Sequence, residues 1–246
     1  GGGGLLVSGR LHVGTSGYQY DHWREIFYPA GLPKDAWFDH YARTFSAVEI
    51  NNTFYNLPGP ETFDRWRDQA PRGFRFAVKF SRYGTHMKKL KDPAEPVARF
   101  LERARHLGAH LGPILVQLPP NWGADPGRLD AFLDAAPADV RWAVELRDRD
   151  WLRAAVYRVL RAHGAALVIH DRLARHPVHV TADFVYLRYH GQDYGGSYSP
   201  QHLSGQARRI GRFLADGLDV HAYFNNDLDG HAVANARDLR RFLGDR

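Results

Sequence analysis

Three residues of this sequence are suited to acid–base chemistry because each lies at the end of a strand-like segment. Glu49 and Glu145 occur in AVEINNTFY and WAVEL, where apolar and polar residues alternate. Successive side chains of a strand point to opposite faces, so each glutamate faces away from its apolar neighbours. His190 directly follows the apolar segment FVYLRY. Carboxylate and imidazole groups in such positions could act as general base and general acid.

Cationic residues stand in equivalent positions. Lys79 ends the segment FRFAVK, and four of the five lysines lie within residues 79–91, together with Arg82 and His86. Lysine and arginine at such sites bind phosphate or carboxylate groups. We therefore expect an anion-binding loop, with an ordinary solvated loop as the alternative. Lys79 could also form a Schiff base if its neighbours lowered its pKa, although a cationic anchor is the commoner use.

Eight strand-like segments alternate with helical patterns of apolar residues along the chain. The segments are 11–14, the start of 47–55, 74–80, 114–118, 142–146, 166–170, 184–189 and 220–224. Only 13 residues separate the sixth from the seventh, so the helix there must be short or irregular. This order predicts a (β/α)8 TIM barrel formed as one domain by residues 10–246. A doubly wound sheet is the alternative, but GTSGYQY lacks its glycine-rich fingerprint.

Composition and the N-terminal residues limit which kinds of site and which cellular location can be expected. Residues 1–9 open with four glycines, and we expect them to be a disordered terminus or a cloning remnant. The chain has no cysteine, which excludes disulfides and thiolate metal sites. No apolar run approaches 18 residues and no signal peptide is evident, so we expect a cytoplasmic protein without membrane contact. The formal charge of +6 is weak evidence for nucleic acid by itself.

In a TIM barrel the apolar face of each strand packs on helices, the other face points inward, and active sites lie at the C-terminal strand ends. The inward face therefore predicts the site. The catalytic candidates are Glu49, Glu145, His190 and Lys79. The substrate-binding candidates, taken from this face and from the loops that follow the strands, are Asn51, Tyr55, Arg82, His86, Gln117, Arg147, Arg188, Asn225, Asn226, Asp227, Tyr18 and Trp23. His12 and Tyr223 also face inward, but we expect them to be satisfied within the barrel interior.

A divalent metal is a further possibility. The oxygen and nitrogen ligands that could converge on one are Glu49, Glu145, Asp171, His170 and His190. No local spacing such as HExxH supports a metal site. The sequence therefore predicts no certain cofactor, and a divalent metal remains an open alternative.

Several motifs resemble those of a known family. They are GTSGYQYDHW, FYP, VEINNTFY, FAVKFSRYGTHMKKLKD, GPILVQLPP, FVYLRYHG and YFNNDLDGHAVANA. In this order and spacing the chain, from Leu11 to Leu243, resembles the YecE-like proteins, catalogued as domain of unknown function 72. The resemblance implies a TIM barrel and no established reaction. Its motif positions fall on Glu49, Asn51, Tyr55, Lys79, Thr85, His86, Gln117, Glu145, Arg147, His190, Asn225, Asn226 and Asp227. Asp148 stands where the family pattern has histidine, so we place position 148 outside the catalytic core.

The leading hypothesis is an enzyme that acts on a phosphate-bearing substrate by acid–base or metal-assisted chemistry, with nucleic-acid phosphoester hydrolysis as its main case. Glu49 or Glu145 would be the general base and His190 the general acid, while Lys79 and Arg188 would bind the phosphate. One alternative is an isomerase or lyase of a small phosphorylated sugar. Another is a non-catalytic module that binds nucleic acid or an anionic metabolite. The sequence does not predict an oligomeric state.

Overall fold

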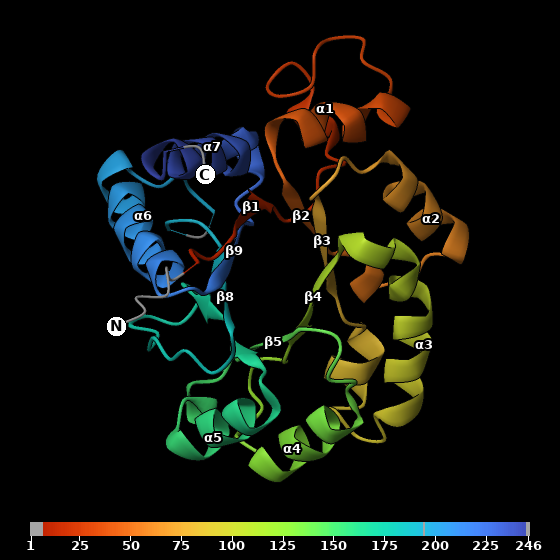
Figure 1. The fold of residues 1–246 in the computed structure, drawn as a ribbon, viewed down its shortest axis with the longest axis vertical. Coiled ribbons are helices and arrows are strands. Elements are labelled where there is room, and N and C mark those ends of the chain that lie inside the picture. Colours follow the sequence, from red (N-terminus) through yellow and green to blue (C-terminus); the bar gives the residue numbers. More distant parts are fainter. Residues whose placement is uncertain (1–6, 194, 245–246) are drawn as a thin grey trace, which may run out of the picture.

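The computed structural model describes residues 7–193 and 195–244 (Figure 1). Residues 1–6, which belong to the segment expected to be a disordered terminus or cloning remnant, lie outside the described residues. The strands are β1 (Leu11–Thr15), β2 (Ala47–Ile50), β3 (Arg75–Lys79), β4 (Leu111–Gln117), β5 (Trp142–Glu145), β6 (Ala166–Leu167), β7 (Ile169–His170), β8 (Phe184–Tyr189) and β9 (Asp219–Phe224). They form two parallel sheets, in the orders β1-β9-β8-β7 and β2-β3-β4-β5-β6.

The two sheets meet at two junctions, one between β6 and β7 and the other between β1 and β2. β6 and β7 are separated only by Val168, whose backbone N donates to the carbonyl oxygen of Val144 at 2.9 Å, so together they form the expected sixth strand. At the other junction the Gly17 backbone N donates to the Glu49 carbonyl oxygen at 2.7 Å. β1 and β2 approach closely there, because a Cβ atom on Gly14 would lie only 1.9 Å from a backbone oxygen of β2. The strands therefore form a TIM-barrel-like ring, which confirms the predicted fold.

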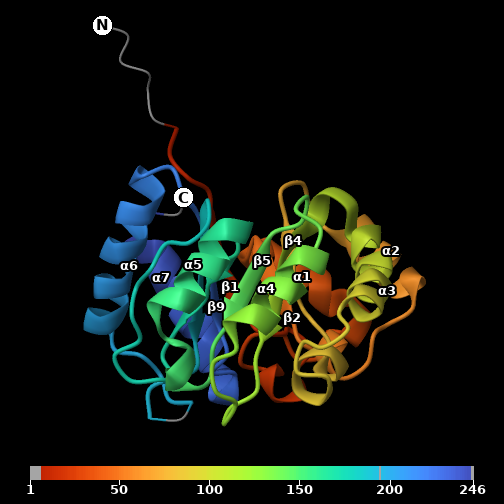
Figure 2. The same ribbon diagram turned by 90° about the horizontal axis from the view of Figure 1, so that it is seen from below.

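Helices surround this ring on the outside (Figures 1 and 2). They are α1 (Trp37–Thr44), α2 (Pro60–Gln69), α3 (Ala94–Ala104), α4 (Pro126–Ala135), α5 (Ala154–His163), α6 (Pro200–Ala215) and α7 (His231–Phe242). Local sequence sets their ends: the Ser199 hydroxyl accepts from the His202 backbone N at 3.1 Å at the start of α6. Residues 171–183, between β7 and β8, contain no helix, as the short spacing predicted. No helix in the described part of the chain is long and apolar enough to cross a bilayer.

The alternation of side chains along the strands divides the core in two. In β3, Phe76 and Val78 pack outward under the helices, whereas Ala77 faces the barrel interior. The buried residues of the interior are Ala47, Ala77, Leu115, Ala143, Ala166, Val168, Phe184, Tyr186 and Tyr223. Polar residues of the same phase follow this layer at the C-terminal strand ends, so the strands themselves place the candidate site.

Candidate functional site

An arginine between two glutamates occupies the C-terminal end of the barrel. Arg188 is 2% exposed and Glu49 and Glu145 are 0% exposed. The Arg188 guanidinium contacts Glu49 through Nη2–Oε1 at 2.8 Å and Nε–Oε2 at 3.1 Å. Its Nη1 donates to Glu145 Oε1 at 3.1 Å and to Gln117 Oε1 at 3.2 Å. Both glutamates and Arg188 therefore converge as predicted, but the guanidinium is engaged by protein acceptors instead of facing a ligand.

The environment of Glu49 keeps this carboxylate ionised. The Tyr186 hydroxyl donates to Oε2 at 2.6 Å and the Ser16 hydroxyl donates to Oε1 at 2.9 Å. Burial raises the pKa of Glu49, but the charge of Arg188 and these hydrogen bonds outweigh it and hold the pKa below its usual value. A carboxylate with a lowered pKa is a weak general base.

Glu145 is linked to an imidazole as well as to Arg188. Arg147 Nε donates to Glu145 Oε2 at 2.6 Å, and His190 Nε2 lies 3.4 Å from Oε1. Burial raises the pKa of Glu145, yet the neighbouring positive charges, Arg188 first, hold it well below its usual value. On the other side of the ring, Asn225 Nδ2 lies 3.3 Å from His190 Nδ1.

His190 is the group at this end that is suited to move a proton. Burial lowers its pKa, so the imidazole is neutral near pH 7. The tautomer assigned from these contacts carries its hydrogen on Nε2, toward Glu145, and accepts at Nδ1 from Asn225. The backbone N of His190 donates to Asp171 Oδ1 at 2.8 Å, which fixes the start of this loop. Glu145, His190 and Asn225 thus form a hydrogen-bonded chain.

Lys79 supplies a cation without a countercharge in direct contact. Its ammonium lies 4.1 Å from the centre of the Phe54 ring. Within residues 7–193 and 195–244 no hydrogen bond or ion pair involves its Nζ atom. Burial, followed by the charge of Arg188, lowers the pKa of Lys79 to about 8. A partly desolvated ammonium with unused donors is suited to bind an anion.

Only some of the residues predicted to bind a divalent metal lie close together in the structure. Ligand atoms of Glu145, His170 and His190 lie within 4.8 Å of one another. However, His170 Nε2 contacts the Leu146 carbonyl oxygen at 2.8 Å, and its Nδ1 accepts from the Arg172 backbone N at 3.1 Å. Both imidazole nitrogens are therefore occupied, and Glu145 is already surrounded by cationic donors. This donor set does not fit a divalent cation.

Three predicted substrate-binding residues flank Lys79. The His86 ring packs edge-to-face on Phe54 with 5.2 Å between centroids. Tyr55 is 73% exposed, and Arg82 is exposed as well. Sequence reasoning missed Tyr83, which is 51% exposed beside Arg82. Together Tyr55, Arg82, Tyr83 and His86 form a rim of aromatic and basic side chains on the loops after β2 and β3, called the β2–β3 rim below.

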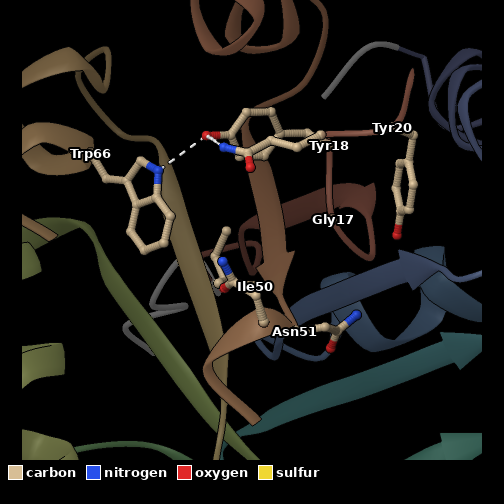
Figure 3. A pocket seen from close by; sticks show the side chains of 8 residues that line it. Gly17, Tyr18, Tyr20, Ile50, Asn51 and Trp66 are labelled. Carbon is tan, nitrogen blue, oxygen red and sulfur yellow. Dashed lines mark hydrogen bonds between the residues drawn. The ribbon is translucent and has the colours of Figure 1, made fainter. Parts of the chain in front are cut away.

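A small cavity of about 180 Å³ opens next to β2 (Figure 3). Figure 3 shows Tyr18 and Trp66 joined by a hydrogen bond above Asn51. The Tyr18 hydroxyl accepts from Trp66 Nε1 at 3.1 Å and from Gln19 Nε2 at 2.8 Å. The Oδ1 atom of Asn51 is buried without a hydrogen-bond partner among the described residues. This cavity offers uncharged hydrogen-bonding groups, whereas the β2–β3 rim is cationic.

The remaining predicted residues lie in contacts between loops. Trp23 is fully buried, and its Nε1 donates to the Asp227 carbonyl oxygen at 2.9 Å. The Asn226 amide donates to Asn235 Oδ1 at 2.9 Å. These contacts pack the loop after β1 and the loop after β9, so Trp23 does not present its ring to the mouth. A role of Trp23, Asn226 or Asp227 in substrate binding stays a prediction.

Two contributors to the site were not predicted, and the phase of the strand could have revealed one of them. Tyr186 lies two residues before Arg188 in β8 and therefore shares its inward face. Ser16 lies just beyond the end of β1, and no periodic signal marks it. Asp148, which replaces the expected histidine, accepts from the Asp150 backbone N at 2.9 Å and has no contact with Glu145 among the described residues.

Comparison with known proteins places the chain in a family. A family model described as protein of unknown function DUF72 matches residues 12–246. The chain belongs to the DUF72 family. It is 39% identical over 112 residues to the UPF0759 protein YecE of Escherichia coli K12, a match that covers 44% of this chain and only 40% of YecE. It is 21% identical over 270 residues to the UPF0759 protein YunF of Bacillus subtilis, which covers 95% of this chain and 94% of YunF.

Solved structures of this family share the fold. A DUF72 family protein from Thermotoga maritima has 26% sequence identity and a TM-score of 0.85, over 95% of this chain and 99% of that one. A DUF72 family protein from Enterococcus faecalis has 20% identity and a TM-score of 0.81, over 95% of each chain. A glycoside hydrolase family 30 subfamily 8 xylanase from Clostridium acetobutylicum, at 11% identity and a TM-score of 0.54, covers 95% of this chain and 70% of its own and shares the fold alone.

Proposed function

We propose that this DUF72 protein is an enzyme that performs acid–base chemistry on a phosphate-bearing substrate, with a nucleic-acid phosphoester as its main case. The observation that carries the proposal is Lys79, a cation at the barrel mouth that contacts no acidic partner in the described part of the chain. The charges of Arg188, Glu49 and Glu145 all act on its pKa, so Lys79 lies in the field of the buried network. An anion bound by Lys79 would therefore sit beside the groups that could transfer a proton.

The roles proposed for the buried residues differ from those expected from the sequence. Glu49 and Glu145 are held as anions by Arg188, so neither is suited to be the general base. His190 takes that role: when the attacking water replaces the Asn225 amide at Nδ1, this nitrogen accepts the proton of the water, and Glu145 stabilises the resulting imidazolium through Nε2–H. Arg188 positions the two glutamates and leaves phosphate binding to Lys79, assisted by Arg147 and the β2–β3 rim.

The β2–β3 rim supports a polymeric substrate. Tyr55 and Tyr83 expose their rings next to Arg82 and His86. Exposed aromatic rings can stack on unpaired bases, and neighbouring cations can contact the phosphates between them. A single-stranded nucleic acid would place a phosphate at Lys79 while adjacent bases rest on the rim.

Hydrolysis of a single-stranded oligonucleotide and of bis(p-nitrophenyl) phosphate tests the proposal. His190→Asn should lower turnover by about 100-fold, because it removes the proton-accepting nitrogen and keeps a similar polar shape. Lys79→Met should weaken oligonucleotide binding and lower its salt dependence. Lys34→Met is the matched control, because it removes the same charge at an exposed lysine whose Nζ is already paired with Asp21 Oδ1 at 3.0 Å. Unchanged turnover and binding in both His190→Asn and Lys79→Met would refute the proposal.

A second candidate, isomerisation or lysis of a small phosphorylated sugar, is favoured by the cavity next to β2. Tyr18 and Asn51 there offer uncharged donors and acceptors of the kind that bind sugar hydroxyls. Binding that weakens steeply with salt would favour nucleic acid, whereas salt-insensitive binding that is lost in Asn51→Ala would favour the sugar. If Lys79→Met abolishes binding and no candidate is turned over, the protein is a binding module instead.

A further inference from the structure

A second cavity, of about 590 Å³, lies at the opposite end of the barrel. Its lining includes residues at the N-terminal starts of β1, β3 and β9, which parallel pairing brings to one end. The side chains that matter here are Arg10, His12, Arg75, Arg141, Asp219 and His221. None of them belongs to the site at the C-terminal end. Most TIM barrels fill this layer with branched apolar side chains, so a polar lining here needs a physical reason.

Two buried histidines form one wall of this cavity. His12 and His221 are paired neighbours in β1 and β9, and their rings stack with 4.4 Å between centroids. His221 Nδ1 lies 3.0 Å from the Tyr223 hydroxyl. His12 Nδ1, in contrast, is buried without a hydrogen-bond partner in the described part of the chain. The expectation that the barrel interior satisfies His12 is therefore wrong, and its Nδ1 atom remains able to hydrogen-bond to a ligand in the cavity.

The arginines of the cavity are only partly neutralised. Arg141 Nη1 pairs with Asp219 Oδ2 at 2.9 Å, and its Nη2 lies 3.6 Å from Asp183 Oδ1, so Arg141 has two carboxylate partners that fix the direction of its guanidinium. Arg75 donates only to the Phe74 carbonyl oxygen, at 3.3 Å, and neither Arg75 nor Arg10 forms an ion pair among residues 7–193 and 195–244. The other carboxylate in the lining, Asp139, is engaged by Arg105 at 2.8 Å. Positive charge therefore exceeds negative charge inside this cavity.

We infer that the cavity at the N-terminal end of the barrel binds a phosphate-type oxyanion, held by Arg75 and Arg10 against Arg141 and His12. A guanidinium presents two parallel N–H donors that match two oxygens of such an anion. The anion supplies the countercharge that Arg75 and Arg10 lack. This site is independent of the proposed function, because it lies at the other end of the barrel and shares no residue with it.

Calorimetric titration with inorganic phosphate tests this inference, with sodium chloride keeping the ionic strength constant. Titrations in the Lys79→Met background remove the contribution of the proposed catalytic mouth. Arg75→Ala should then weaken phosphate binding by about 10- to 100-fold, because a charge-assisted hydrogen-bonding partner is lost. Arg75→Lys should weaken it less, since the charge remains and the paired donors are lost. Arg72→Ala is the matched control, because Arg72 is exposed nearby and does not line the cavity.

The His12 imidazole gives a second readout that does not depend on affinity. Burial and then the charge of Arg75 lower the pKa of His12 to about 4, so a phosphate seated here should raise that pKa and shift the ring proton resonances of His12. Phosphate binding that survives Lys79→Met and is lost in Arg75→Ala supports the site. Binding that is lost in Lys79→Met and unchanged in Arg75→Ala overturns it and leaves the proposed function standing. No phosphate binding in the Lys79→Met background, with His12 resonances unmoved, also overturns it.

Discussion

The two ends of this barrel bury charged and titratable groups in different ways. At the C-terminal end, Arg188 is matched by Glu49 and Glu145, and the remaining lone pairs of the carboxylates are used by hydroxyl and guanidinium donors. At the N-terminal end, Arg75 has no carboxylate partner among residues 7–193 and 195–244, and His12 keeps a nitrogen without a hydrogen-bond partner in the same residues. The first end is a completed network, whereas the second is a set of groups for which we inferred an anion.

This difference teaches which residues at each end are free to bind a ligand. In a completed network the central charged side chain positions its carboxylate partners, and only neighbouring side chains are left to bind a ligand. Lys79 and His190 are those neighbours at the mouth. At the N-terminal end, the arginines themselves have donors left to bind a ligand. Arginine at the end of a barrel strand is therefore poor evidence for a ligand until its partners are known.

Removing the central charge of the completed network should have the largest effect. Arg188→Met leaves Glu49 and Glu145 buried without their main countercharge, so the free energy of unfolding should fall by about 3–5 kcal/mol. Urea denaturation measures this change. Arg105→Ala, which removes an exposed partner of Asp139, should leave the unfolding free energy nearly unchanged.

A triple variant without these three charges tests whether the loss of stability comes from unpaired buried carboxylates. Glu49→Gln, Glu145→Gln and Arg188→Met together remove the charges at once, and should recover part of the stability lost in Arg188→Met alone. An Arg188→Met protein as stable as the wild type would contradict the description of this end as a completed network.

The pH dependence of stability should contain contributions from both ends, and His170 and His190, whose pKa values burial lowers, act in the same interval as His12. In the unfolded chain His12 takes up a proton near pH 6.5, whereas in the folded protein it does so only near pH 4, so the free energy of unfolding falls as pH drops through this interval. Glu49 and Glu145 have lowered pKa values, so their contribution is present above pH 4.5 and is lost as pH falls below that value.

Two variants assign these intervals, with denaturation followed from pH 7 to pH 3. His12→Asn should flatten the profile between pH 6.5 and pH 4 by about 1–3 kcal/mol and leave the lower interval in place. Glu145→Gln should lower the free energy of unfolding above pH 4.5 and flatten the profile below that value. Identical profiles for His12→Asn and the wild type would contradict the buried neutral state of His12.

The smallest expected effect concerns Lys79. Its pKa falls from 10.5 to about 8 in the folded protein, so at pH 7 the charged ammonium costs stability. Lys79→Met should therefore raise the unfolding free energy by about 1 kcal/mol, a figure reduced from the full pKa shift because the side chain is half-buried. The same variant should weaken phosphate binding at the mouth. A stabilised protein with poorer binding is the pattern of a residue kept for function.

Periodicity in the sequence was enough to predict the fold and most of the inward face. Glu49, Lys79, Glu145 and Arg188 share one phase of their strands, and the structure places them at the same end of the barrel. Spacing alone also predicted a short or irregular helix between β7 and β8, where the structure has an irregular segment. These features are local, because they depend only on the face of a strand on which a residue lies and on the number of residues between two strands.

Partner choice across the barrel could not be predicted in the same way. Arg188 was expected to face a phosphate, yet residues 43 and 139 positions away in the sequence occupy its donors. His12 was expected to be satisfied, and nothing in its strand reveals that its nitrogen has no partner. Trp23 was expected at the mouth, but the loop after β1 folds it inward. Such contacts depend on packing between distant segments, which periodicity does not encode.

The pairing of β1 with β9 has a consequence for how this protein is synthesised. Leu11 pairs with Val220, and the adjacent Arg10 N–Asp219 contact spans 209 residues of sequence. The five strands β2 to β6 can assemble as they emerge, but β1 must wait for almost the whole chain before its sheet partner exists. Loop closure over such a distance is slow, so the pairing of β1 with β9 should form later than the pairing among β2 to β6. Barrel closure is therefore expected to be a late folding step, in which β1 joins the last strand of its sheet.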